Sequence, residues 1–256
     1  MPSTAHAAGR GRQSPACRLT GATLSGRVRE AYTALYEDFG RWTPSEAFRR
    51  TFTGSVIEEL RRRLSTQTHI SVLEVGCGHG TWASEVYEQL PQASERVEYL
   101  GIDFTEPRIE LGRQRLAGHP SARLMTADCE QFQPETSFDL ILGIEVISHV
   151  ERNKYREWLD RWFGWLSLGG TVIIIDKDRF TRHALRLSWD VFKRRWLPWS
   201  AGNRPYYFPE HFGDYAGTIY YPSFSSLCRM AAGIGYVARP LFEHGAFRAL
   251  LLDKPV

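Results

Sequence analysis

A run of apolar residues, Val72–Val75, leads directly into a loop with glycine at every second position, namely Gly76, Gly78 and Gly80. Glycine lets the backbone approach a ligand closely, and the first N–H groups of a following helix are free to bind one. The pattern therefore predicts a ligand-binding turn between a strand and a helix. A dinucleotide fingerprint would require glycine at position 81, where Thr81 stands, so the spacing disfavours a nicotinamide cofactor.

Further motifs with acidic residues and glycines follow in order along the chain. They are Gly101-Ile102-Asp103, Ala127-Asp128-Cys129, Phe138-Asp139-Leu140-Ile141 running on to Glu145-Val146-Ile147-Ser148-His149-Val150, and Leu166-Ser167-Leu168-Gly169-Gly170-Thr171-Val172. Together with the acid-x-Gly-x-Gly-x-Gly turn that begins at Glu74, this series resembles the class I S-adenosylmethionine-dependent methyltransferases of the small-molecule type. The resemblance covers about residues 70–176 well and the C-terminal strands in outline.

The elements that must position these motifs are short apolar runs alternating with helical segments, which predicts a parallel sheet. A tight connection between two further C-terminal runs forces an antiparallel pair. The expected fold class is α/β: a Rossmann-like, doubly wound, mostly parallel seven-stranded sheet with an antiparallel C-terminal hairpin. The expected strands are Ser71–Val75, Val97–Ile102, Ala122–Thr126, Phe138–Ile144, Thr171–Ile175, Tyr236–Glu243 and Phe247–Asp253.

Helical periodicity predicts two helices before the sheet, the first from Ser25 and the second after a capping box formed by Thr43 and Glu46. These helices make up a helical N-terminal extension. The second has apolar residues along one face, and later stripes predict helices that cover the sheet. The apolar positions are Phe48, Phe52, Ile57, Leu60 and Leu64 in the extension, then Trp82, Val86 and Leu90, then Tyr155, Trp158, Leu159, Trp162, Phe163 and Leu166, and a last helix is expected near Ser223–Ala232.

The predicted organisation is a single methyltransferase domain, residues 25–256, preceded by a tail. Residues 1–24 contain three arginines, no acid and few large apolar groups, so we expect a disordered basic tail. An acid-free start with arginines is also typical of organelle transit peptides, which is the alternative. Residues 177–222 are expected to form a helical and aromatic insert after the fifth strand that covers the substrate.

The resemblance implies S-adenosyl-L-methionine as the cofactor. Asp103 ends the second strand, where a carboxylate can accept bonds from both ribose hydroxyls, with a helix cap as the alternative. Asp128 is implied as the acceptor from the adenine amino group, with a surface turn as the alternative. The full set of implied cofactor-binding residues is Glu74, Gly76, Cys77, Gly78, Gly80, Asp103, Phe104, Asp128, Cys129, Ile144 and Glu145.

Four of these residues carry more specific expectations. Glu74 interrupts an otherwise apolar strand end, where a bare carboxylate is costly, so a ligand or a loop N–H is expected as its partner; bracing of the loop alone is the alternative. The resemblance places the Ile144 carbonyl and the Glu145 side chain beside the methionine portion of the cofactor. The Cys129 backbone N–H is implied as a donor to an adenine ring nitrogen.

An oxygen or nitrogen acceptor must lose a proton, so a base is expected. His149 is the first candidate, because it is expected to open the helix after the fourth strand and to face the reactive end of the cofactor, and an imidazole titrates near neutral pH; packing at a helix start is the alternative. His211, within the insert, is the second candidate, and plain solvation is its alternative. No metal-binding HExxH motif is present, and in-line placement of the acceptor makes a metal unnecessary.

Composition and charge limit the classes of function. The 256 residues are 43% hydrophobic with a formal net charge of +3, which fits one core and demands neither nucleic acid nor an anionic membrane. The stretch Glu145–Ser148 also lacks the proline-rich aromatic motif typical of nucleic-acid methyltransferases. The cysteines form no CxxC pair, and no apolar run reaches the roughly 18 residues of a membrane span. A cytoplasmic protein is expected.

The expected function is in-line methyl transfer to an oxygen or nitrogen of a small, largely apolar or aromatic metabolite that can be acidic, with a carbon acceptor as the less favoured alternative. Aromatic rings and basic residues in 177–222 favour such an acceptor. Residues 179–200 suit a lid over the pocket or, alternatively, a surface helix in peripheral membrane contact, with a lipid or quinone precursor as acceptor. A catalytically silent S-adenosylmethionine-binding protein and a nicotinamide oxidoreductase are the rival readings.

Overall fold

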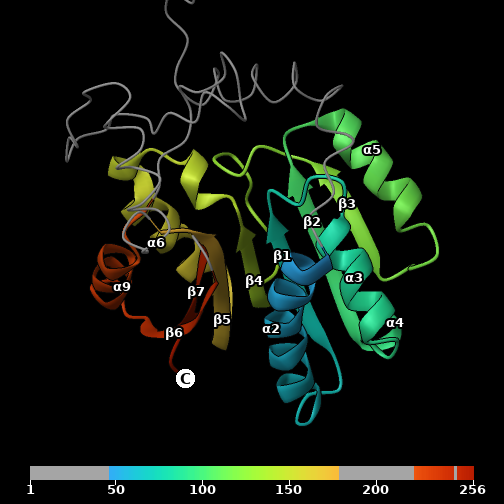
Figure 1. Cartoon of the computed structure of the whole chain (residues 1–256), viewed down its shortest axis with the longest axis horizontal. Coiled ribbons are helices and arrows are strands. Elements are labelled where there is room, and N and C mark those ends of the chain that lie inside the picture. Colours follow the sequence, from blue (N-terminus) through green and yellow to red (C-terminus); the bar gives the residue numbers. More distant parts are fainter. Residues whose placement is uncertain (1–45, 179–221, 245–246) are drawn as a thin grey trace, which may run out of the picture.

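A computed structural model describes residues 46–178, 222–244 and 247–256 of the chain (Figure 1). The predicted tail, the first predicted helix and most of the predicted insert lie outside these ranges. Seven strands form one sheet in the order β3-β2-β1-β4-β5-β7-β6. Their bounds are β1 Ile70–Val75, β2 Val97–Asp103, β3 Ala122–Thr126, β4 Phe138–Ile144, β5 Leu166–Lys177, β6 Val237–His244 and β7 Phe247–Asp253.

The pairing of the strands confirms the predicted fold class. β1 to β5 pair in parallel, whereas β7 is antiparallel to both of its neighbours, β5 and β6. Because the carboxyl ends of the parallel strands lie at one edge of the sheet, the loops that follow β1, β2 and β4 come together there (Figure 1). Open α/β sheets bind their ligands at this edge.

The predicted start of the fifth strand was wrong. β5 begins at Leu166 rather than Thr171, because Leu166 pairs with Phe138 before a register shift in the β4–β5 ladder. Gly169 has a φ of 73°, which a residue with a side chain rarely adopts, and so accommodates the irregularity. The strand also continues to Lys177, so the first residue of the range 177–222 belongs to the sheet.

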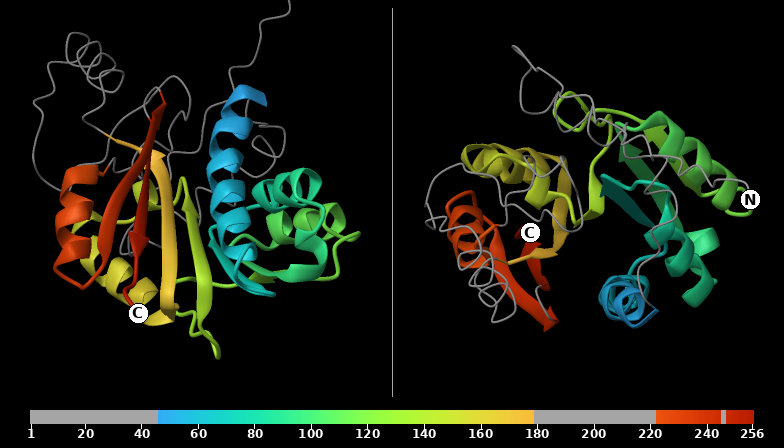
Figure 2. Two further views of the ribbon diagram at one scale, coloured as in Figure 1. Left: turned by 90° about the horizontal axis from the view of Figure 1, so that it is seen from below. Right: turned by 45° about the horizontal axis from the view of Figure 1, so that its top comes forward.

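Helices cover both faces of the sheet (Figure 2). One face carries α2 (Glu46–Leu64), α3 (Thr81–Gln89) and α5 (Glu106–Arg115), with the short α4 (Ala93–Arg96) beside them; the other face carries α6 (Tyr155–Trp165) and α9 (Phe224–Ala232). Successive strand residues point to opposite faces, so Val72 packs toward α2 while Leu73 packs toward α6. Burial on both faces explains the nearly continuous apolar runs in the sequence.

Helix α2 is fixed to the sheet by a buried polar network as well as by its apolar face. Arg63, only 4% exposed, donates to Glu59 at 2.7 Å and to the Thr171 hydroxyl of β5 at 2.6 Å. Burial alone would raise the pKa of Glu59, but the guanidinium groups of Arg62 and Arg63 lower it overall. The predicted apolar face of α2 is confirmed at Phe52, Ile57, Leu60 and Leu64, all of them buried.

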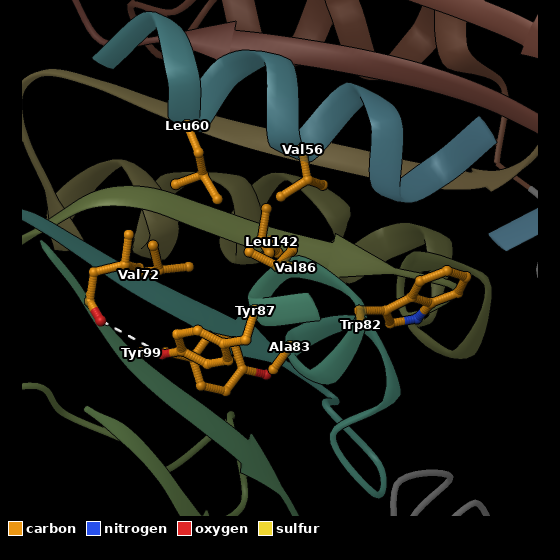
Figure 3. Close-up of a pocket in the computed structure, with 10 residues that line it drawn as sticks. Val56, Leu60, Val72, Trp82, Ala83, Val86, Tyr87, Tyr99 and Leu142 are labelled. Atoms are coloured by element: carbon orange, nitrogen blue, oxygen red, sulfur yellow. Dashed lines mark hydrogen bonds between the residues drawn. The ribbon is translucent and has the colours of Figure 1, made fainter. Parts of the chain in front are cut away.

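A cavity of about 10 Å³ lies between α2, α3 and the sheet (Figure 3). Leu60 and Val56 line it from α2, and Val86 lines it from α3. Because its lining is apolar and its volume is at the limit for a single water molecule, the cavity is a packing feature of the core rather than a ligand site.

None of the helices in the described part of the chain has the length and apolar character that a membrane span requires.

Candidate functional site

The glycine loop after β1 adopts a backbone conformation that favours glycine. Gly76, Gly78 and Gly80 have φ values of 69°, 55° and 69°, in the region that favours glycine. A Cβ on Gly76 would lie 2.6 Å from Val146 Cγ2, so the loop also packs closely against the segment after β4. The N–H of Gly76 donates to the Ile102 carbonyl at 2.8 Å and fixes the start of the loop to the end of β2.

Asp103 ends β2 directly beside this loop. Its Oδ2 accepts a hydrogen bond from the Gly78 N–H at 3.0 Å, and its Oδ1 accepts one from the Thr105 N–H at 2.8 Å. The side chain is 7% exposed. A carboxylate has about four acceptor positions, so two protein donors leave capacity for two hydroxyl groups. The bond to Thr105, which precedes α5, also gives Asp103 a local structural role.

Glu74 lies at the carboxyl end of β1 and is 1% exposed. A ligand or a loop N–H was expected as its partner; among protein groups the structure instead provides the Tyr99 hydroxyl, which donates to Oε2 of Glu74. Burial raises the pKa of Glu74 to about 8, the bond from Tyr99 opposes this rise, and the charge of Asp103 adds to it. Glu74 thus joins β1 to β2 through Tyr99, a strand residue that neither the expected partners nor the alternative of loop bracing included.

Tyr99 was not among the residues predicted from the sequence. It lies four residues before Asp103 in β2, so strand alternation places both side chains on one face, and that spacing was the available signal. Cys77 contributes a buried thiol to the same cluster. Burial, followed by the charges of Glu74 and Asp103, raises the pKa of this thiol well above its usual value, so Cys77 is not a nucleophile near neutral pH.

The loop after β3 adjoins Asp103. The Ala127 N–H donates to the Asp103 carbonyl at 2.9 Å, and Asp128 Oδ1 accepts from the Glu130 N–H at 2.9 Å, which is the turn geometry of the alternative interpretation. Arg161 of α6 donates to the carbonyls of Cys129 and Glu130 at 3.0 and 2.5 Å. The loop is therefore fixed from both sides, and no local sequence signal pointed to Arg161.

The prediction that His149 opens the helix after β4 was wrong. His149 ends the single 3-10 turn η1 (Ile147–His149), which a second turn, η2 (Arg152–Lys154), separates from α6. The buried Asp176 of β5 accepts from the Ser148 N–H at 2.8 Å and from the Lys177 N–H at 2.7 Å. Burial raises the pKa of Asp176 to about 6, against the effect of these two bonds. Asp176 was not predicted either.

Glu145, the first residue after β4, has a φ of 55°, unusual for a residue with a side chain. Its N–H donates to the Ile175 carbonyl at 2.7 Å. Its Oε1 lies 3.0 Å from Lys177 Nζ, so the carboxylate faces β5. Ile144 is buried and pairs with Ile175. Glu145 and Lys177 thus form an ion pair at the carboxyl ends of β4 and β5.

The structure brings most of the predicted residues to one edge of the sheet. At this edge lie the glycine loop after β1, Asp103 and Phe104 at the end of β2, and the Asp128 loop after β3. Glu145 and His149 follow β4. His211 and residues 179–200 lie outside the described residues, so the second base and the lid or membrane helix stay predictions. Within the described ranges, no group of three or more His, Cys, Asp or Glu could hold a metal ion.

The residues at this edge fit an S-adenosyl group. Asp103 has acceptor capacity for the ribose hydroxyls, and the turn at Gly78 is open, since a Cβ there would meet only an Arg108 nitrogen at 3.8 Å. Asp128 and the Cys129 backbone would hold adenine, and Glu145 would face the methionine amino group. The acceptor groups of Asp103 and Glu145 thus suit a ligand with hydroxyls at one point and a cation at another.

Comparison with known proteins agrees with this geometry. Residues 73–172 match a family of methyltransferase domains. The chain is 26% identical over 174 residues to the ubiquinone/menaquinone biosynthesis C-methyltransferase UbiE of Geobacter sulfurreducens, which is 64% of either chain. It is 28% identical over 139 residues to a malonyl-(acyl-carrier protein) O-methyltransferase of Bacillus anthracis, covering 54% of this chain and 49% of the relative. The matches span less than two thirds of either relative.

Solved structures share the fold. Magnesium protoporphyrin IX methyltransferase (ChlM) from Synechocystis PCC 6803 with bound SAH has a TM-score of 0.64 at 14% identity, covering 91% of this chain and 100% of the other. A DhpI-SAM-HEP complex has a TM-score of 0.65 at 16% identity, covering 91% and 99%. This chain therefore has the class I, Rossmann-like fold of the S-adenosylmethionine-dependent methyltransferases. The methyltransferase-domain match spans residues 73–172, and these two solved structures hold SAH and SAM.

Proposed function

We propose that this chain transfers the methyl group of S-adenosylmethionine to an oxygen or nitrogen atom of a small, largely apolar or aromatic metabolite. The observation that carries the proposal is the Asp103 carboxylate, held by the Gly78 and Thr105 N–H groups beside a loop of positive-φ glycines. A carboxylate at the end of the second parallel strand, next to such a loop, suits a ribose. The names of two relatives, a C-methyltransferase of ubiquinone/menaquinone biosynthesis and a malonyl-(acyl-carrier protein) O-methyltransferase, support methyl transfer as the reaction.

S-adenosylmethionine, when bound, supplies an electrophilic methyl group on a sulfonium. The chain has to orient that group and the acceptor in line, which contributes much of the rate. Asp103 and the loop after β3 hold the nucleoside end, and Glu145 orients the methionine end by its charge. His149, on the turn after β4, takes the proton that an oxygen or nitrogen acceptor must lose.

Calorimetry with S-adenosylmethionine and with NAD tests the cofactor assignment. We expect binding of the first and none of the second, and absence of heat with S-adenosylmethionine would contradict the proposal. Incubation with labelled donor and pooled metabolites, followed by mass spectrometry, then identifies the product that carries the label. A chain that binds the donor and labels nothing would support the catalytically silent alternative.

A further inference from the structure

Four aromatic side chains gather on the α2 face of the sheet. The ring of Phe52 lies at their centre, with centroid distances of 5.0 Å to Phe247, 5.5 Å to Phe242 and 6.0 Å to Trp82. Phe52 is fully buried, whereas the other three rings are only partly buried. We refer to Trp82, Phe242 and Phe247 as the aromatic wall, an apolar surface that solvent reaches.

The aromatic wall lies at the same edge of the sheet as the cofactor residues. Trp82 is the second residue of α3, directly after the glycine loop, and lies at the far end of the cavity lining from Leu60 (Figure 3). Phe247 opens β7 and is paired in register with Lys177, the last residue of β5. The wall therefore extends from the glycine loop to the carboxyl end of β5.

Lys177 places a positive charge on this wall. Its Nζ lies 4.9 Å from the centroid of the Phe247 ring and 3.0 Å from Glu145 Oε1. The Lys177 and Glu145 side chains are 30% and 25% exposed, so a ligand can reach the pair while it remains partly shielded from water. An ammonium has three N–H donors and can bind a second carboxylate beside Glu145.

Other charges near the wall are already paired in a different way. Asp178, which is 1% exposed, binds Arg248 at 2.6 Å, and Arg248 also binds Glu243 at 2.7 Å. Arg248 is thus held between two carboxylates, whereas the Lys177 ammonium is paired with Glu145 and also lies over the Phe247 ring. Among the described residues, Lys177 is the cation placed to meet a ligand on the aromatic wall.

We propose that Lys177 and the aromatic wall bind the methyl acceptor, and that the acceptor is an aromatic ring carrying a carboxylate. This inference rests on the proposed function, because it assigns a substrate class to the same site. The rings of Trp82, Phe242 and Phe247 provide apolar contact for a planar ligand, and the ammonium binds its carboxylate. Glu145 competes for the same ammonium and so weakens the binding of acids.

Two probes of the same shape test the proposal. 2-Naphthoate and 2-naphthamide differ in charge but have the same ring system, and their binding is measured by calorimetry with and without saturating S-adenosylhomocysteine. We expect the wild-type chain to bind the acid at least about tenfold more tightly than the amide, a ratio that corresponds to ~1.4 kcal/mol. Lys177→Met should remove this preference, and Lys177→Arg should keep most of it.

Two further variants give the expected pattern an internal check. Glu145→Gln removes the competing carboxylate and should increase the preference for the acid. Phe247→Leu should weaken both probes to a similar extent, since it changes ring contact without changing charge. Glu145→Gln thus changes the preference for the acid, whereas Phe247→Leu leaves the preference unchanged and lowers both affinities. This difference separates the role of Lys177 from general damage to the site. An unchanged melting temperature confirms that each variant is folded.

Equal binding of the two probes by the wild-type chain, including no binding of either, would overturn the inference. A preference for the acid that survives in Lys177→Met would also overturn it, because another cation would then bind the carboxylate. Heat from S-adenosylhomocysteine alone reports on the proposed function. The two probes are also titrated without S-adenosylhomocysteine, so their binding is measured independently of cofactor binding. A failure of the cofactor assignment can therefore be told apart from a failure of the acceptor assignment.

Discussion

The buried carboxylate of Asp176 accepts a hydrogen bond at 2.8 Å from the backbone N–H of Ser148. This bond joins the end of β5 to the 3-10 turn that ends at His149. Replacing a buried acceptor leaves an N–H without a partner, which costs about 1–3 kcal/mol, so the turn depends on Asp176 for its position. The turn that carries His149 is thereby positioned by a residue of β5.

His149→Ala should lower kcat by roughly 10²–10⁴-fold while the affinity for S-adenosylmethionine stays nearly unchanged, because a general base acts on the acceptor's proton. Single-turnover kinetics and calorimetry measure the two quantities. Asp176→Asn, which keeps an oxygen for the Ser148 N–H, should lower kcat less. A His149→Ala chain that is unstable, with normal turnover in the fraction that folds, would favour a packing role.

Asp103→Ala should weaken cofactor binding by several kcal/mol at most, since each charge-assisted bond to a ribose hydroxyl contributes about 1.5–3 kcal/mol. Calorimetry gives the affinity. Asp139→Ala is the matched control, because Asp139 also accepts two bonds, from the Ser71 N–H and hydroxyl, both at 2.9 Å, but near the amino end of β4. Near-normal affinity in Asp103→Ala would refute the ribose assignment.

Glu74→Gln should change how stability depends on pH. The carboxyl has a pKa of about 8 in the folded chain and an ordinary value of 4.5, so the folded state binds an extra proton between these values. The free energy of unfolding therefore falls as pH rises from about 4.5 to 8, by on the order of a few kcal/mol. The Gln variant lacks this titration.

Thermal unfolding of both chains between pH 5 and pH 8.5, taken in small steps, measures the effect. We expect the melting temperature of the wild type, relative to that of Glu74→Gln, to fall steadily with pH. The titration of Asp176 is common to both chains and cancels in the difference. A difference that does not vary with pH would show that Glu74 ionises near its ordinary value in the folded chain.

Arg161→Leu should weaken cofactor binding about tenfold or less, because the carbonyls of Cys129 and Glu130 lose the guanidinium that positions the loop after β3. Arg156→Leu is the control, since Arg156 lies on the same helix and donates to the Gly233 carbonyl, away from the loop. Equal affinities of the two variants for S-adenosylmethionine would show that Arg161 does not position the loop for cofactor binding.

The sequence predicted the strands well where local pattern decides them. β3, β4 and β7 were predicted to the residue, because each is an apolar run with clear ends. The early start of β5 was missed, since the pairing of Leu166 with Phe138 across a register shift is a tertiary relationship. An apolar pattern cannot show which neighbour a strand end will meet.

The candidate site was predictable in its motifs but not in the contacts that support them. Asp103 and the glycine loop follow from spacing, whereas the bonds from Tyr99 to Glu74 and from Arg161 to the Cys129 loop depend on how distant elements pack. Lys177 was assigned to the insert, and only its register with Phe247 shows that it belongs to the sheet. Partners of buried charges are set by the fold as a whole.

The place of β7 in the sheet also has a consequence for biosynthesis. β7 lies between β5 and β6 yet leaves the ribosome after both of them, and among the described strands β6 pairs with β7 alone. Until β7 is made, the outer edge of β5 presents unpaired backbone groups, which are a template for association with other chains. A nascent chain that stalls before Phe247 would therefore expose this edge, and we expect chaperones to bind it there.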